Sequence, residues 1–173
     1  MYKKLLRESA YELTLLCVSD PDTLRYVERR LTRFFKEVVC FEGHEEALEA
    51  CKQRRFDILF IDLDMEKTRK CFFAESAREQ SELQAIVPFS LDYQNCDLLM
   101  RLIRLGVDGF VKKPLDDQEL YYTLAKICEK ILDRQLLMHY LDELEKLQQK
   151  MIPLRKQESK PTEIKSKAPV QDD

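Results

Sequence analysis

Apolar residues along the chain gather in five short runs, which are separated by longer segments with polar positions. The runs cover residues 13–18, 38–41, 58–61, 85–89 and 107–112. A short continuous apolar run that is rich in β-branched and aromatic residues is typical of a strand buried on both faces. We therefore predict five strands at these positions.

The segments between these runs have the periodicity of helices that bury one face. The first begins after Asp20 and Pro21, a capping side chain followed by a proline that suits the first helical turn. The remaining helices are predicted at residues 45–53, 66–81 and 94–105, and from residue 118 onward. Each predicted strand is thus followed by a helix.

Strands that alternate with helices predict an α/β fold with a parallel sheet covered on both faces. Right-handed crossovers favour a doubly wound, flavodoxin-like sheet with strand order 2-1-3-4-5. The functional crevice of such a sheet lies at the carboxyl ends of its strands. The side chains at four of these ends are Asp20, Asp62, Ser90 and Lys113.

Two carboxylates, a hydroxyl and an ammonium group in one crevice suit a hard divalent cation and a phosphoryl group. Asp20 and Asp62 offer the oxygen ligands that Mg²⁺ prefers. Asp62 is also a candidate nucleophile that accepts phosphate as an acyl phosphate. Lys113 would neutralise one phosphoryl oxygen, and the Ser90 hydroxyl would donate to another.

Each of these residues also has an ordinary structural interpretation. Alone, Asp62 would be a turn acid, Ser90 a turn residue and Lys113 a surface lysine, while Asp20 would cap the following helix. Their occurrence in order at four predicted strand ends favours the functional interpretation.

The motifs at these positions resemble those of the response regulator receiver family. The segments that carry the likeness are VSDPD, FIDLDM, VPFSL and GVDGFVKKP, and the resemblance covers roughly residues 12–133. It implies phosphorylation of Asp62 with Mg²⁺, which would also contact the main-chain carbonyl of Asp64. It further implies that Ser90 and Phe110 act as the switch residues, and that the partner is a histidine kinase or a phosphotransfer protein.

The sequence departs from the family pattern at several points. Where the family has two adjacent acids after the first strand, this chain has Ser19 and Asp20. Glu66 stands where the family has proline, and Leu91 replaces the small residue after the strand-four hydroxyl. The loss of one acid predicts weaker Mg²⁺ binding, since fewer charges face the ion.

The C-terminal part predicts an extended helix, because no Gly or Pro occurs between residues 118 and 152. Its first apolar positions have the spacing of a helix docked on a sheet. A second series, Leu137, Leu141, Leu144 and Met151, follows a heptad spacing and predicts a coiled coil, hence a possible homodimer. The alternative is a solvated extension, since two or three heptads are marginal alone.

The predicted organisation has four parts. They are a short helical lead (1–11), the receiver domain (12–133), a helical, coiled-coil-like extension (134–152) and a disordered tail (153–173). The tail is predicted from its polar, proline-containing composition.

Composition narrows the classes of function. The net charge is −3 without a basic face, which disfavours nucleic acid as a partner. No apolar run is long enough to cross a bilayer, and the first residues do not resemble a signal peptide, so we expect a cytoplasmic protein that does not bind membranes.

Three alternatives to a phosphorylated, non-enzymatic receiver stay open. One is a degenerate receiver that serves as an interaction scaffold without phosphorylation. Another is the input module of a longer regulator, whose linker helix begins near residue 134. The third is an aspartyl phosphatase, because Asp62 and Asp64 form a DxD pair, although the Thr and Gly that usually follow are missing.

Overall fold

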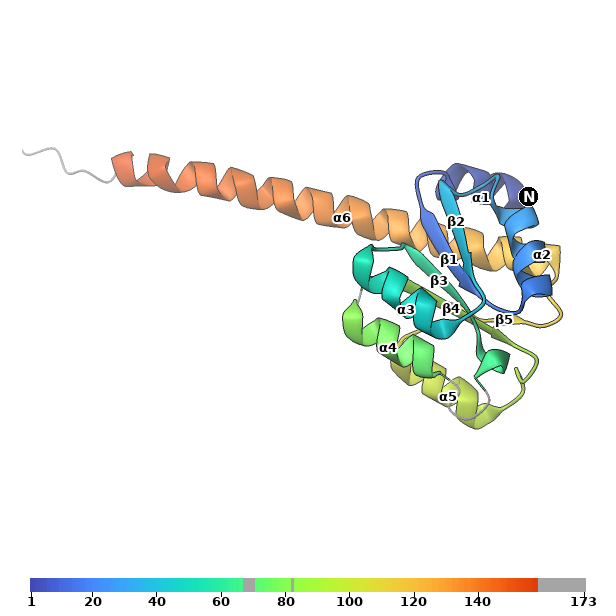
Figure 1. The fold of residues 1–173 in the computed structure, drawn as a ribbon. Helices are drawn as coiled ribbons and strands as arrows, with labels where there is room; N and C mark the ends of the chain where they lie inside the picture. Colours follow the sequence, from blue (N-terminus) through green and yellow to red (C-terminus); the bar gives the residue numbers. More distant parts are fainter. Residues whose placement is uncertain (67–70, 82, 159–173) are drawn as a thin grey trace, which may run out of the picture. The chain divides into compact units, whose positions relative to one another are not determined.

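The computed structural model describes residues 1–66, 71–81 and 83–158, with side chains through residue 150 (Figure 1). The strands are β1 (Thr14–Val18), β2 (Glu37–Phe41), β3 (Ile58–Asp62), β4 (Ala85–Ser90) and β5 (Val111–Lys112). The α-helices are α1 (Tyr2–Ala10), α2 (Pro21–Leu31), α3 (His44–Gln53), α4 (Phe72–Gln80), α5 (Cys96–Leu105) and α6 (Asp117–Glu158). A single 3₁₀ turn, η1 (Leu63–Met65), directly follows β3.

The strands form one five-stranded parallel sheet in the order β2-β1-β3-β4-β5, which confirms the predicted fold class. The registers align the carboxyl ends of the inner strands. Asp62 lies opposite Phe89, and Ser90 lies opposite Lys112. The side chains that follow these strands are therefore brought to the same edge of the sheet.

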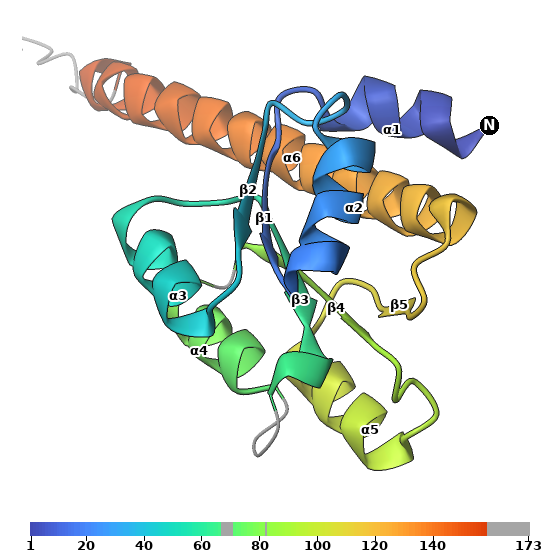
Figure 2. The same ribbon diagram turned by 45° about the vertical axis from the view of Figure 1, so that its right-hand side comes forward.

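Helices cover both faces of the sheet, and alternate strand residues enter two separate cores (Figure 2). On one face, Cys17 and Phe60 pack with residues of α1, α2 and the first part of α6. On the other face, Leu16 and Ile61 pack with residues of α3, α4 and α5. Burial on both faces explains why the strands read as continuous apolar runs without polar alternation.

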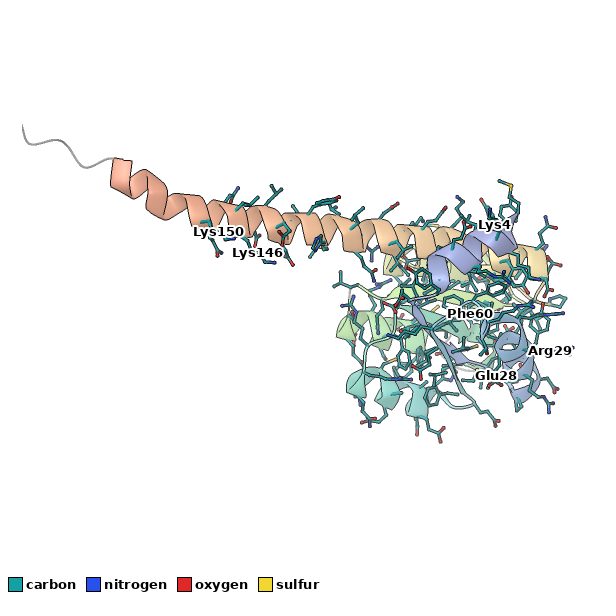
Figure 3. The ribbon with its side chains drawn as sticks, turned by 90° about the horizontal axis from the view of Figure 1, so that it is seen from above. Lys4, Glu28, Arg29, Phe60, Lys146 and Lys150 are labelled. Carbon is teal, nitrogen blue, oxygen red and sulfur yellow. The ribbon has the colours of Figure 1, made fainter. Side chains whose placement is uncertain are left out.

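Phe60 is a central member of the first core. Its ring is fully buried and stacks on the ring of Phe89, with centroids 4.2 Å apart. Figure 3 shows it among the closely packed side chains around the sheet. Two aromatic rings in contact stabilise neighbouring strands beyond the area that they bury.

Helix α1 is part of the same compact unit. Leu6 and Ala10 are fully buried in the first core, and the ring of Tyr2 packs edge-on against that of Tyr122 in α6 at 4.8 Å. Residues 1–11, which the sequence set apart as a lead, therefore contribute to the core of residues 1–133.

Two predicted elements differ from the observed ones. The helix predicted at residues 66–81 begins only at Phe72, because the Glu66 carboxylate accepts hydrogen bonds from the amides of Phe72 and Phe73 at 2.8 and 2.7 Å. The strand predicted at residues 107–112 contains only Val111 and Lys112. Before it, Asp108 replaces regular pairing: its carboxylate accepts the Ile86 amide at 3.0 Å, and its amide donates to the Ile86 carbonyl at 2.9 Å.

The chain divides into two compact units, Met1–Asp133 and Arg134–Asp173, and helix α6 has residues in both. In the first unit it buries an apolar face made of Leu120, Leu124, Ile127 and Ile131. In the second unit the side chains through residue 150 are exposed, among them Lys146 and Lys150, labelled in Figure 3.

The helix continues beyond the predicted boundary at residue 152. It includes Pro153 and ends at Glu158, so residues 153–158 of the predicted tail are helical. A proline removes one intrahelical hydrogen bond, and that loss does not always end a helix. The rest of the predicted tail, residues 159–173, lies outside the described residues. Within the described part, no helix combines the length and apolar character needed to cross a bilayer.

Candidate functional site

The candidate site lies at the carboxyl edge of the sheet, where the structure brings together all four side chains predicted from the strand ends. Asp62 ends β3 and Ser90 ends β4, while Asp20 follows β1 and Lys113 follows β5. The peptide bond between Lys113 and Pro114 is cis. The parallel topology places these groups at one edge, although they are separated by up to 93 positions along the chain.

Asp62 is the fully buried acid at the centre of the site. Its Oδ2 accepts the hydroxyl of Ser19 and the ammonium group of Lys113, each at 2.5 Å. Its Oδ1 accepts the amide of Asp64 at 3.0 Å. The cation and the two neutral donors fix the direction of this buried carboxylate.

Asp20 caps helix α2 and faces the site at the same time. Its Oδ1 accepts the amides of Asp22 and Thr23, each at 3.1 Å, and its Oδ2 accepts the Thr23 hydroxyl at 2.6 Å. The Thr23 hydroxyl is the largest cause that lowers the pKa of Asp20 to about 2, with help from the Thr23 amide and Lys113. Asp20 is therefore a carboxylate throughout the neutral range.

Ser90 is fully buried, and its hydroxyl is already engaged. The Ser90 Oγ donates to Oδ1 of Asp64 at 2.5 Å and accepts the amide of Asp92 at 3.0 Å. The other oxygen of the Asp64 carboxylate accepts the amide of Leu91 at 2.8 Å. The only proton of this hydroxyl is thus committed to Asp64.

Three carboxylates converge on Lys113. Its Nζ lies 2.5 Å from Asp62, 3.5 Å from Asp64 and 3.9 Å from Asp20. The Lys113 side chain is only 14% exposed, so solvent screens these interactions weakly. One ammonium group thus faces three acids, which leaves a surplus of negative charge that favours a second cation.

The donor set fits Mg²⁺, a hard cation that prefers oxygen ligands. The Ser19 hydroxyl has one proton and lies nearer to Asp62, at 2.5 Å, than to Oδ2 of Asp20, at 3.3 Å. Asp20 Oδ2 then accepts only the Thr23 hydroxyl and keeps one acceptor position for a metal. Among the described residues, no group of three or more His, Cys, Asp or Glu side chains is arranged as a metal cage. Mg²⁺ usually relies on one or two carboxylates with several waters, so it needs no such cage.

Phe110, the predicted switch aromatic, lies directly before β5. Its ring is partly buried and packs against the second core, the one covered by α3, α4 and α5. The role of Phe110 and Ser90 as switch residues stays a prediction.

Sequence reasoning missed several groups that shape the site. From the sequence, Ser19 was noted only as a position where the family has an acid. In the structure its hydroxyl donates directly to the buried Asp62. Thr23 holds Asp20 from within α2, and the side chain of Asp64 holds Ser90. The contact of Thr23 could have been predicted from the sequence, because Thr23 lies three residues after the capping acid Asp20. The direction of the Asp64 side chain depends on the η1 turn and had no signal in the residue spacing.

A surface pocket lies next to these groups. Its lining includes Thr23 and Tyr26 of α2, Leu91 after β4, and Lys113 with the following Pro114. The side chain of Leu91 is 64% exposed. Of the site residues described above, Thr23 and Lys113 line this pocket.

Comparison with known sequences decides the family. The sequence model of the response regulator receiver domain matches residues 15–125. The chain belongs to this family. The likeness predicted from the motifs is thereby confirmed.

Curated proteins that match the chain include a sensor protein and a histidine-protein kinase. Sensor protein GacS of Pseudomonas syringae pv. syringae is 28% identical over 119 residues, which are 65% of this chain and 13% of GacS. Signal transduction histidine-protein kinase BarA of Escherichia coli (strain K12) is 25% identical over 126 residues, which are 69% of this chain and 13% of BarA. The chain thus matches a small part of each of these longer proteins, and the match corresponds to their receiver domains.

Solved receiver structures have the same fold. The receiver domain of AraT, a response regulator from Geobacillus stearothermophilus, is 28% identical with a TM-score of 0.58, and the match covers 71% of this chain and 98% of that domain. Chemotaxis protein CheY4 of Vibrio cholerae is 21% identical with a TM-score of 0.61, covering 67% of this chain and 98% of CheY4. At that identity the second match shows the fold alone.

Proposed function

We propose that this receiver domain is switched by phosphorylation of Asp62 in the presence of Mg²⁺, and that it signals through protein association rather than by catalysis. The observation that carries the proposal is the pairing of the buried Asp62 carboxylate with Lys113 at 2.5 Å. A buried acid and an ammonium group at the carboxyl edge of a parallel sheet suit phosphoryl transfer, which depends on positioning and charge neutralisation.

The donor would be a phosphohistidine of a histidine kinase or of a phosphotransfer protein. An oxygen of Asp62 forms a bond to phosphorus while the bond between phosphorus and the donor imidazole nitrogen breaks. The imidazole leaves with the electron pair of that bond and takes a proton from solvent. Lys113 neutralises charge on the transferred group, and the Ser90 hydroxyl donates to one of its oxygens.

Asp20, Asp62 and the main-chain carbonyl of Asp64 would hold Mg²⁺. When bound, the ion supplies neutralisation of the phosphoryl charge. The capping bonds from Thr23 and α2 fix the Asp20 carboxylate, so this ligand is preorganised. Asp62 is preorganised in the same way by the Ser19 hydroxyl and the Asp64 amide.

The experiment that tests the proposal is phosphoryl uptake from a small acyl phosphate. Wild-type protein is incubated with acetyl phosphate, with and without Mg²⁺, and its intact mass is measured. We expect one added phosphoryl group with Mg²⁺ and much less after chelation, whereas Asp62→Asn should take up none. A wild-type protein that stays unmodified would support the scaffold alternative.

The scaffold alternative has two observations in its favour. Ser19 stands in place of the first of the two adjacent acids after β1, and the Asp64 carboxylate accepts the proton of the Ser90 hydroxyl. A scaffold would bind its partner equally well before and after treatment with acetyl phosphate. The phosphorylated receiver predicts a difference between the two states.

The proposed output is association through the second unit of α6, as a homodimer or as part of a longer regulator. Leu137, Leu141 and Leu144 are 59%, 46% and 55% exposed, so an apolar stripe is available to a partner. Coupling between the site and this stripe is expected to change the association constant by about 5- to 150-fold.

Sedimentation of the free and beryllofluoride-bound protein measures this coupling. We expect the association constants of the two states to differ, and Ser90→Ala to reduce the difference. Leu141→Lys should remove helix-driven association in both states, whereas Lys146→Gln, on the same helix, should not. An unchanging monomer in both states would favour a linker that belongs to a longer regulator.

A further inference from the structure

The phosphoryl-binding groups of the site are already bound to an acid of the chain itself. The Asp64 carboxylate accepts the Ser90 hydroxyl at 2.5 Å and the Leu91 amide at 2.8 Å, and it lies 3.5 Å from the Lys113 ammonium group. Two of these donors, Ser90 and Lys113, are the ones that the proposed function assigns to the phosphoryl oxygens. The Asp64 side chain is 21% exposed, so these contacts are largely shielded from water.

We propose that the Asp64 carboxylate is a built-in competitor of the phosphoryl group, an inference that rests on the proposed function of Asp62. The carboxylate matches the phosphoryl group in charge sign and in offering several acceptor oxygens. The Ser90 hydroxyl has one proton and cannot donate to both. Phosphorylation therefore has to displace Asp64 from Ser90, or proceed without the Ser90 hydrogen bond.

The position of Asp64 in the chain makes such displacement possible. It lies in η1, a single 3₁₀ turn directly after β3, while its own amide stays bonded to Oδ1 of Asp62 at 3.0 Å. Rotation of the side chain would release Ser90 and Leu91 without breaking this backbone contact. The Asp64 carboxylate thus sets how readily Asp62 is phosphorylated. In the free protein it also holds the Ser90 hydroxyl in one direction.

A different role for Asp64 would be to supply the metal charge lost at Ser19. The observed contacts argue against this role, because both oxygens face the hydroxyl, amide and ammonium donors. A metal ligand needs an oxygen directed to the ion, and Oδ2 of Asp20 keeps an acceptor position for it. The two roles predict opposite effects when Asp64 is removed.

The test is the affinity for beryllofluoride with Mg²⁺, measured by titration calorimetry on the full chain. Wild type has to break the hydrogen bond between Ser90 and the charged Asp64 carboxylate, and Asp64→Ala does not, so the variant should bind beryllofluoride roughly tenfold more tightly or better. Asp64→Asn keeps the size of the side chain and removes its charge, and it should gain less. Asp22→Asn is the matched control. It removes an exposed carboxylate close to Asp20, and the affinity for beryllofluoride should change little.

The affinity for Mg²⁺ alone is the second readout. Asp64→Ala should lose far less Mg²⁺ affinity than Asp20→Asn does. Equal losses in the two variants, or a beryllofluoride affinity of Asp64→Ala no better than wild type, would overturn the competition. If neither wild type nor any Asp64 variant binds beryllofluoride, the proposed function fails and the competition fails with it.

Discussion

The two units of the chain differ in how far their apolar and charged side chains are buried or bonded within the unit. In Met1–Asp133 the apolar side chains of the inner strands enter two cores, and even the acid at the centre of the site has bonded partners on both oxygens. In the second unit, Leu137, Leu141 and Leu144 lie exposed on a continuous helix. The stripe of the second unit, which has no core around it among the described residues of that unit, has the character of a surface for another chain.

The largest expected effect is a difference in the free energy of unfolding between substitutions in the two units. Phe60→Ala should lower the free energy of unfolding by about 3–5 kcal/mol, because it removes a fully buried ring that stacks on Phe89. Leu141→Ala, measured at a concentration where the chain is monomeric, should change it by less than about 0.5 kcal/mol. Urea denaturation measures both variants. A comparable loss in Leu141→Ala would show that the stripe is already covered in the monomer.

A second prediction concerns the ion pair at the centre of the first unit. Lys113→Met should destabilise the protein by about 3 kcal/mol at neutral pH, because it leaves the buried Asp62 carboxylate without its cation. Lys112→Met, at the exposed neighbouring position, is the control and should be nearly neutral. If Lys113→Met were as stable as wild type, the pairing with Asp62 would not hold the site together.

A third prediction restores the missing acid. Ser19→Asp places a second buried carboxylate beside Asp62, so it should lower stability without metal and raise Mg²⁺ affinity by roughly tenfold. Ser19→Ala separates the loss of the hydroxyl from the gain of charge. Unfolding curves at several Mg²⁺ concentrations report both effects. An unchanged Mg²⁺ affinity in Ser19→Asp would show that this position does not face the ion.

The smallest expected effect is a change in the titration of Asp20. Its pKa of about 2 lies below the ordinary 3.8, so its capping bonds stabilise the fold above pH 3.8 and are lost as the pH falls through 2. Thr23→Val removes the largest cause and should move the pKa toward 3.8. Carbon NMR of the side-chain carboxyl group measures this value. Thr32→Val, whose hydroxyl bonds to a carbonyl at the end of α2, should leave it unchanged.

The sequence predicted the sheet well because its strands are buried on both faces. Runs such as 58–61 are apolar without alternating polar positions, so they could be recognised as strands. Their alternation with helices then led to the predicted strand order. The start of α4 was predicted too early because Glu66, the first residue of the predicted helix, instead accepts hydrogen bonds with its side chain from the Phe72 and Phe73 amides at the start of the helix. The length of β5 was overestimated because Asp108 bonds to Ile86 in place of regular pairing.

The candidate site was predicted in part for a similar reason. Strand ends in a parallel sheet share one edge, so Asp20, Asp62, Ser90 and Lys113 were expected to lie together, and they do. The hydrogen-bond partners of these groups depend on side-chain rotamers and on a 3₁₀ turn. Spacing along the chain does not encode them, and the contact of Asp64 with Ser90 emerged only from the fold.

The most direct test of the central claim is to locate the modified residue after treatment with acetyl phosphate and Mg²⁺. Borohydride reduction converts an aspartyl phosphate to homoserine, which peptide mass spectrometry assigns to one position. We predict conversion at Asp62 alone, with Asp20 and Asp64 unmodified. Conversion at Asp64 or Asp20, or at no aspartate while the wild-type fold is intact, would contradict the account.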